Sequence, residues 1–199
     1  MVKKKAIKKM KKSSAVKKNS LKMKNKKMVK KAIKNKKKKV LAIPKGYHSI
    51  IPYIVMHHAS KAIEFYKKAF DAKESFRMEQ PNGKIAHAEL KVGDSKIMLG
   101  DECSEKNTRS PETYGESAIT IHFYTKNVDK VVDKAISLGA KIIRPIENMF
   151  YGDRCAMIED PYGHKWHVST HIEDVTPAKA KKRAAEGSVA NRPLQSAII

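Results

Sequence analysis

The chain has 199 residues, of which 43 are Lys or Arg and 20 are Asp or Glu, so its formal net charge is +23 at pH 7. Residues 1–40 contain twenty lysines and no acidic residue, whereas residues 41–175 contain 18 basic and 19 acidic residues. This distribution excludes a protein that is basic throughout and indicates a near-neutral globular domain with a cationic arm. Two isolated cysteines, Cys103 and Cys155, argue against a disulfide framework and favour a reducing, cytoplasmic location. We expect no membrane span, because no run approaches about 18 apolar residues.

We divide the chain into a lysine-rich disordered arm (1–45), a folded domain (46–176) and a basic, Ala-rich C-terminal tail (177–199). The arm has too few large apolar side chains to offset the entropy of ordering it. One interpretation is a non-specific contact of residues 1–40 with nucleic acid or an anionic surface, which weakens as salt rises. The alternative is a solvated tail that keeps the protein soluble. A transit peptide is disfavoured, because such peptides prefer arginine.

The domain begins with a strand–helix–three-strand pattern. Residues 48–56 are apolar and β-branched, which predicts a strand. Ser60 is the expected N-cap of a helix, since apolar residues recur behind it at spacings of three and four up to Phe70. Three further strands are predicted at residues 74–79, 85–92 and 96–99, separated by turns at 81–83 and 93–94.

The same order recurs after a polar loop at residues 101–116. We predict a strand at 118–124, a helix that opens at Asn127 or Asp129 and closes at Gly139, and a short strand at 141–144 that Pro145 stops. Two more strands follow at 154–159 and 165–170. Two tandem βαβββ modules indicate an α+β fold in which the modules pair.

Several motifs resemble the vicinal oxygen chelate superfamily, which includes glyoxalase I, the bleomycin-resistance proteins and extradiol dioxygenases. These motifs are residues 63–70 (IEFYKKAF) and 159–164 (EDPYGH). Four more segments resemble the PhnB-like branch of that superfamily: 87–90 (HAEL), 96–101 (KIMLGD), 150–154 (FYGDR) and 170–175 (THIEDV). The resemblance covers about residues 47–176. It implies a curled mixed sheet around a cavity, with the helices outside, and a homodimer.

Strand alternation then predicts which side chains face that cavity. We expect Ile119, Ile121, Phe123, Trp166 and Val168 to pack against the helices. The expected ligand-binding side chains are Tyr53, His87, Glu89, Met98, Thr120, His122, Tyr124, Arg154 and His167. Arg154 would either clamp an anionic ligand or pair with Asp153 or Glu159.

The resemblance also implies where a metal would bind. Metal-dependent members take four ligands from the first and last strands of the two modules, and these positions fall at Ile51, Met98, Thr120 and His167. Only His167 is a good ligand, so we predict no metal and no other cofactor. A non-standard divalent metal site remains open, because His87, Glu89, His122 and His167 would converge if they shared one cavity.

Three functions remain open from the sequence. The first is a metal-free binder of a small molecule in the sheet cavity. The second is an isomerase, dioxygenase or transferase of the same superfamily, for which His87, Glu89 and His167 are the candidate catalytic residues. The third is a polyanion-binding accessory protein that acts through its lysine arm. No glycine-rich nucleotide or methyltransferase motif is present.

Overall fold

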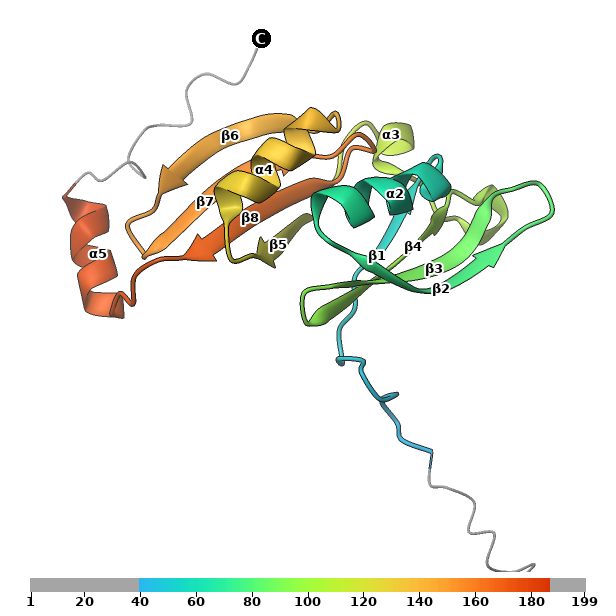
Figure 1. Cartoon of the computed structure of the whole chain (residues 1–199), viewed down its shortest axis with the longest axis horizontal. Helices are drawn as coiled ribbons and strands as arrows, with labels where there is room; N and C mark the ends of the chain where they lie inside the picture. Colours follow the sequence, from blue (N-terminus) through green and yellow to red (C-terminus); the bar gives the residue numbers. More distant parts are fainter. Residues whose placement is uncertain (1–39, 187–199) are drawn as a thin grey trace, which may run out of the picture. The chain divides into compact units, whose positions relative to one another are not determined.

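The computed structural model describes residues 40–186, and the predictions for most of the lysine arm and for the end of the tail lie outside them. Residues from Gly46 onward form one compact unit, separate from the unit that contains residues 40–45. Each predicted module is a four-stranded mixed sheet with one long helix packed on one face (Figure 1). This α+β architecture confirms the predicted fold class. In the described part, no helix combines the length and apolar composition needed to cross a membrane.

The first sheet has the strand order β1-β4-β3-β2. Strand β1 pairs with β4 in parallel, and the other neighbours are antiparallel. Its elements are β1 (Tyr53–Met56), α2 (Ala59–Ala69), β2 (Lys73–Glu79), β3 (Ile85–Val92) and β4 (Ser95–Asp101).

The second sheet repeats this topology with the order β5-β8-β7-β6. Its elements are β5 (Thr120–Tyr124), α4 (Val128–Ser137), β6 (Lys141–Asn148), β7 (Asp153–Glu159) and β8 (Lys165–His171). Between the sheets, the predicted polar loop contains a 3₁₀ turn, η1 (Ser104–Lys106), and the short helix α3 (Pro111–Tyr114). A further helix, α5 (Pro177–Ala185), follows the second sheet and was not predicted.

The start of the domain differs from the prediction in two ways. Strand β1 begins only at Tyr53, because Pro52 has no N–H to donate to a ladder, and residues 48–51 are largely exposed. Helix α2 is preceded by His58, in the left-handed conformation at φ 59°, and not by Ser60. The side chain of His58 makes no capping hydrogen bond. Instead, the carboxylate of Asp101 at the end of β4 accepts from the Ala59 N–H at 2.9 Å, which satisfies one of the free donors at the start of the helix.

The second module also corrects two predictions. Strand β6 does not stop at Pro145 but runs on to Asn148, because it is the edge strand and its pairing with β7 is irregular from Ile142 to Glu147. Ile119 precedes β5 and is 72% exposed, so it does not pack against the helices. The expected N-cap Asn127 is confirmed, because its side chain accepts from the Lys130 N–H.

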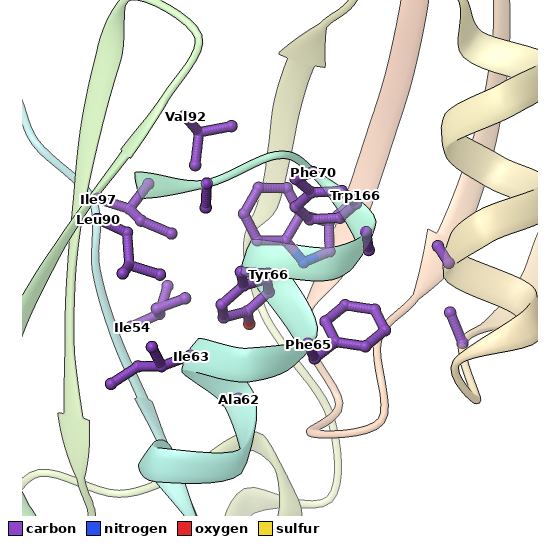
Figure 2. Close-up of a cluster of buried hydrophobic side chains, with 14 of the residues drawn as sticks. Ile54, Ala62, Ile63, Phe65, Tyr66, Phe70, Leu90, Val92, Ile97 and Trp166 are labelled. Carbon is purple, nitrogen blue, oxygen red and sulfur yellow. The ribbon is translucent and has the colours of Figure 1, made fainter. Parts of the chain in front are cut away.

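The core joins the two modules. Helices α2 and α4 contact each other, and aromatic rings of α2 meet Trp166 of β8 (Figure 2). The ring centroids of Tyr66 and Phe70 lie 5.5 and 4.8 Å from that of Trp166. The expected packing of Trp166 and Val168 is confirmed, since both are almost fully buried.

A buried carboxylate lies at the centre of this contact. Asp160, in the turn after β7, accepts from the Tyr66 hydroxyl at 2.6 Å and the Trp166 indole at 2.9 Å. Its second oxygen accepts from the backbone N–H groups of Tyr162 and His164. Burial, reinforced by the Asp160 charge, raises the pKa of Tyr66 well above its ordinary value, so the phenol remains a donor.

We predict that Asp160→Ala lowers the free energy of unfolding by about 3 kcal/mol or more, because each buried donor left without an acceptor costs about 1–3 kcal/mol. Urea unfolding followed by tryptophan fluorescence measures the change. The matched control is Asp133→Ala, since Asp133 is an exposed residue of α4, and we expect its effect to stay within about 0.5 kcal/mol. Equal stability of the two variants would contradict the central role of Asp160.

Candidate functional site

The candidate site consists of the two sheet faces opposite the helices, which we call the open faces. Residues that alternate toward α2, such as Ala88, Leu90 and Leu99, are fully buried. The residues between them point the other way and remain partly exposed unless polar neighbours cover them. All expected ligand-binding residues except Arg154 belong to this second set.

Three rings form a stack on the open face of the second sheet. His122 and His167 are cross-strand partners on β5 and β8, with ring centroids 4.6 Å apart and planes inclined by only 5°. Tyr124 stacks on the other side of His122, also at 4.6 Å. Thr120 precedes them on the same side of β5 by alternation. The three rings therefore share a face as predicted, and their role in ligand binding stays a prediction.

Hydrogen bonds fix most of this stack. The His122 Nε2 atom lies 2.9 Å from the Ser169 hydroxyl. Tyr124 donates to buried Asp153 at 2.7 Å, and the other oxygen of Asp153 lies 2.7 Å from Nδ1 of His171. The Asp153 contact raises the pKa values of both Tyr124 and His171.

His167 differs from its neighbours. Its Nε2 atom is buried and has no hydrogen-bond partner among the described residues. Burial lowers the pKa of His167, and the nearby His122 and Arg144 lower it further. A neutral imidazole with one free nitrogen can donate to or accept from a bound molecule, depending on its tautomer.

The open face of the first sheet carries aromatic and apolar side chains. Tyr53 stacks on His87 with ring centroids 5.7 Å apart, and Phe76 approaches His87 from the other side at 5.9 Å. Met98 is the cross-strand partner of both Tyr53 and Glu89. These four strands therefore present a surface that combines rings, a thioether and one carboxylate.

Glu89, the carboxylate of this face, is almost fully bonded. Tyr47 places its hydroxyl 2.6 Å from both carboxylate oxygens, and Lys96 donates at 2.8 Å. The ammonium of Lys96 also lies 3.8 Å from the centre of the Tyr47 ring. These bonds lower the pKa of Glu89, chiefly through Lys96. His87 lies 3.8 Å from the same carboxylate, so these two candidate catalytic residues are in contact.

Arg154 is the site residue that the structure places elsewhere. Its guanidinium binds Asp129 on α4 through two nitrogens, at 2.6 and 2.9 Å, and Asn148 at 3.0 Å. The expected pairing with Asp153 or Glu159 is therefore wrong. Arg154 lies on the helix side of β7, because alternation puts it on the face opposite Asp153.

The four positions that the resemblance assigns to a metal are not cross-strand partners in this structure. Met98 faces Tyr53 and not Ile51, and His167 faces His122 and not Thr120. The phenol of Tyr53 and the thioether of Met98 are poor ligands for a hard divalent ion, which leaves only the two imidazoles. Among the described residues, no three His, Cys, Asp or Glu side chains lie close enough to share a metal, so His87, Glu89, His122 and His167 do not converge within one chain.

Three important residues were missed by the sequence analysis. Tyr47 lies in a segment without regular structure, and it contacts a residue 42 positions away. Lys96 and Asp153 lie in the PhnB-like segments 96–101 and 150–154, but only the folded structure reveals their hydrogen-bond partners. Alternation alone would have placed both side chains on the open faces.

We predict that His167 titrates below the ordinary histidine value of about 6.5 and His171 above it, as judged by NMR of the ring C–H signals. Because the pKa of His167 is lowered in the folded state, the unfolded state binds more protons than the folded state as pH falls below about 6.5. The contribution of His167 to stability is therefore complete above about pH 6.5 and is lost as pH falls through the folded-state pKa. His122→Gln should raise the pKa of His167 by removing a neighbouring imidazole. A His167 titration at or above that of His171 would contradict this assignment.

Comparison with known proteins agrees with the fold. The model of the Glyoxalase/Bleomycin resistance protein/Dioxygenase superfamily matches residues 50–168. An uncharacterized protein of Mycobacterium tuberculosis (strain ATCC 25618 / H37Rv) is 34% identical over 131 residues, which cover 64% of this chain and 76% of that protein. A similar protein of Mycobacterium bovis is 34% identical and is covered over 86% of its length.

Solved structures show the same fold at lower identity. Protein PA1353 from Pseudomonas aeruginosa has a TM-score of 0.54 at 17% identity, with 63% of this chain and 99% of that chain covered. TioX from Micromonospora sp. ML1 has a TM-score of 0.51 at 20% identity, over 63% of this chain and 99% of that chain. The PhnB protein from Bacillus cereus has a TM-score of 0.50 at 18% identity, over 62% and 99%. With its tandem modules and the match to the family model, the chain belongs to the Glyoxalase/Bleomycin resistance protein/Dioxygenase superfamily.

Proposed function

We propose that the protein binds a small amphipathic molecule on its open faces, without the four-ligand metal site of the metal-dependent members. The observation that carries the proposal is the stack of Tyr124, His122 and His167, which leaves one buried imidazole nitrogen unbonded on a partly exposed surface. A polar atom of this kind is costly to leave without a partner. A ligand that combines an apolar ring with a hydrogen-bonding group would supply one.

The chemistry of Glu89 favours binding over acid–base catalysis. A general base works best when its pKa lies near the operating pH. The bonds from Lys96 and Tyr47 move the pKa of Glu89 in the opposite direction, which makes the carboxylate a weaker base. The His87–Glu89 pair therefore serves better as polar lining than as a catalytic dyad.

The proposal includes a homodimer in which a second copy covers the open faces. Large apolar or aromatic side chains are exposed on them: Tyr53, Phe76, Met78 and Tyr124 are each between 47% and 58% exposed. Phe76 and Met78 share the open face of the first sheet, because their cross-strand partners are Glu89 and His87. Covering such side chains is favourable by roughly 25 cal/mol per Å² of apolar surface.

Two more elements of the proposal rest on composition. The two cysteines are free, which is consistent with a cytoplasmic location. The twenty lysines of residues 1–40 supply the charge for a non-specific contact with nucleic acid or an anionic surface.

Ligand binding is tested with Nile red, a neutral planar dye whose fluorescence rises in apolar surroundings. We expect saturable binding to the full chain, and a loss of about tenfold in affinity, equivalent to about 1.4 kcal/mol, in His122→Ala and in Met98→Ala. The control is His57→Ala, because His57 lies at the start of α2 and its ring bonds Thr113 and not the open faces. Equal binding by all three variants would show that the dye sits elsewhere.

Dimerisation is tested by sedimentation at micromolar concentration. We expect a dimer for the native chain and a shift toward monomer for Phe76→Glu, because the new charge would have to be buried against the second copy. Val40→Glu is the control, since Val40 is 91% exposed and lies outside the sheets. A native chain that sediments as a monomer would disprove the second copy as the cover.

A further inference from the structure

A cavity lies at one end of both sheets, beside the core residue Phe70. It has a volume of about 740 Å³, and we call it the lysine cleft. The segment between α2 and β2, the β3–β4 turn, and the ends of β5 and β8 form its walls. Its lining includes Phe70, Asp71, Lys73, Lys91, Phe123 and Lys126.

The lysine cleft carries an excess of positive charge. Lys73, Lys91 and Lys126 form no ion pair with any residue between 40 and 186. Asp71 is the single carboxylate among the lining residues, so the cleft has three ammonium groups for one carboxylate. The charge imbalance is a property of this cavity, because residues 41–175 as a whole are nearly neutral.

Strand pairing holds two of these lysines together. Lys73 and Lys91 are direct partners across the β2–β3 ladder, and Lys91 is also the partner of Lys96 across β3–β4. Like charges in directly opposite positions destabilise a sheet. Lys96 is neutralised by Glu89 at 2.8 Å, whereas Lys73 and Lys91 have no such partner in the described part. An anion in the cleft would relieve this repulsion.

The rest of the lining is aromatic. Phe70 and Phe123 pack with ring centroids 5.3 Å apart, and Tyr124 adds a further ring to the wall. A planar apolar group can lie against such rings while its charged end meets the lysines. Aromatic rings beside lysines therefore favour an aromatic anion over an inorganic anion.

We propose that the lysine cleft is a second binding site, which takes a small aromatic molecule bearing an oxyanion group, a phosphate or a carboxylate. Lys73 and Lys91 of the first module and Lys126 of the second bind the oxyanion. Phe123, which packs against the buried ring of Phe70, contacts the aromatic ring of the ligand. The site adjoins the open faces: Tyr124 lines both, and Lys91 lies on the open-face side of β3 beside its partner Lys96.

The test is calorimetric titration of the full chain with 1-naphthyl phosphate at about 0.15 M salt, where long-range charge effects are screened beyond about 8 Å. Titrations with 1-naphthoate, neutral 1-naphthol and inorganic phosphate complete the series. We expect one of the two aromatic anions to bind best, which distinguishes the phosphate from the carboxylate. Tight binding of 1-naphthol, or no binding of either anion, would overturn the proposal.

Variants separate the cleft from the lysine arm and from the open faces. Lys73→Gln, Lys91→Gln and Lys126→Gln should each weaken the preferred anion by about tenfold, the usual effect of losing a charge-assisted contact, whereas Lys91→Arg should retain binding. Lys68→Gln is the matched control, because Lys68 is an exposed lysine of α2 outside the cleft. Equal affinity in all variants would assign the binding to the arm and refute the cleft.

Stability provides an independent readout. Because Lys91→Gln removes a like-charge contact, its melting temperature should equal or exceed that of the native chain. A marked decrease in the melting temperature would show that Lys91 stabilises the fold. It would contradict the proposal that Lys73 and Lys91 repel each other without a counterion. Nile red binding should be unchanged in the cleft variants, so failure of this site and failure of the open-face proposal are distinguishable.

Discussion

The buried carboxylate of Asp160 is the interaction on which the arrangement of the two modules depends. It accepts hydrogen bonds from Tyr66 of the first module and from Trp166, Tyr162 and His164 of the second. A carboxylate that is taken out of water needs such partners, because an unpaired buried charge is very costly. The cost of separating the modules is therefore electrostatic as well as hydrophobic, and the aromatic contacts of Tyr66 and Phe70 with Trp166 form around this centre (Figure 2).

The sheet faces that the two long helices cover determine which side chains remain accessible for binding. Both long helices pack on one face of their sheets, so the opposite faces keep their rings, imidazoles and carboxylate partly accessible (Figure 1). The two open faces differ in chemistry, because one contains a charged cluster around Glu89 and the other a stack of rings around His122. The proposed amphipathic ligand matches this difference. The lysine cleft lies at the ends of the strands, where side chains of both modules meet around a separate cavity.

Much of the fold follows from periodicity. The order of elements, the boundaries of β3 and the pairing of His122, Tyr124 and His167 on one face all come from alternation and helical spacing. The failures occur where a distant residue intervenes. Asp101 replaces the expected N-cap Ser60, and the irregular edge pairing of β6 tolerates Pro145. Local sequence cannot reveal such partners, because they are brought together only by the sheet.

The sequence by itself determined the tandem modules, the family and the separation of a lysine-rich arm from a neutral domain, because these depend on composition and on short-range patterns. The tertiary structure decided which side chains meet. It paired Met98 with Tyr53 and His167 with His122, bound Arg154 to Asp129, and covered Glu89 with Tyr47. Strand register and side-chain hydrogen bonds join residues more than twenty positions apart, so they depend on how the sheets pair and not on the residues next to each one in the chain.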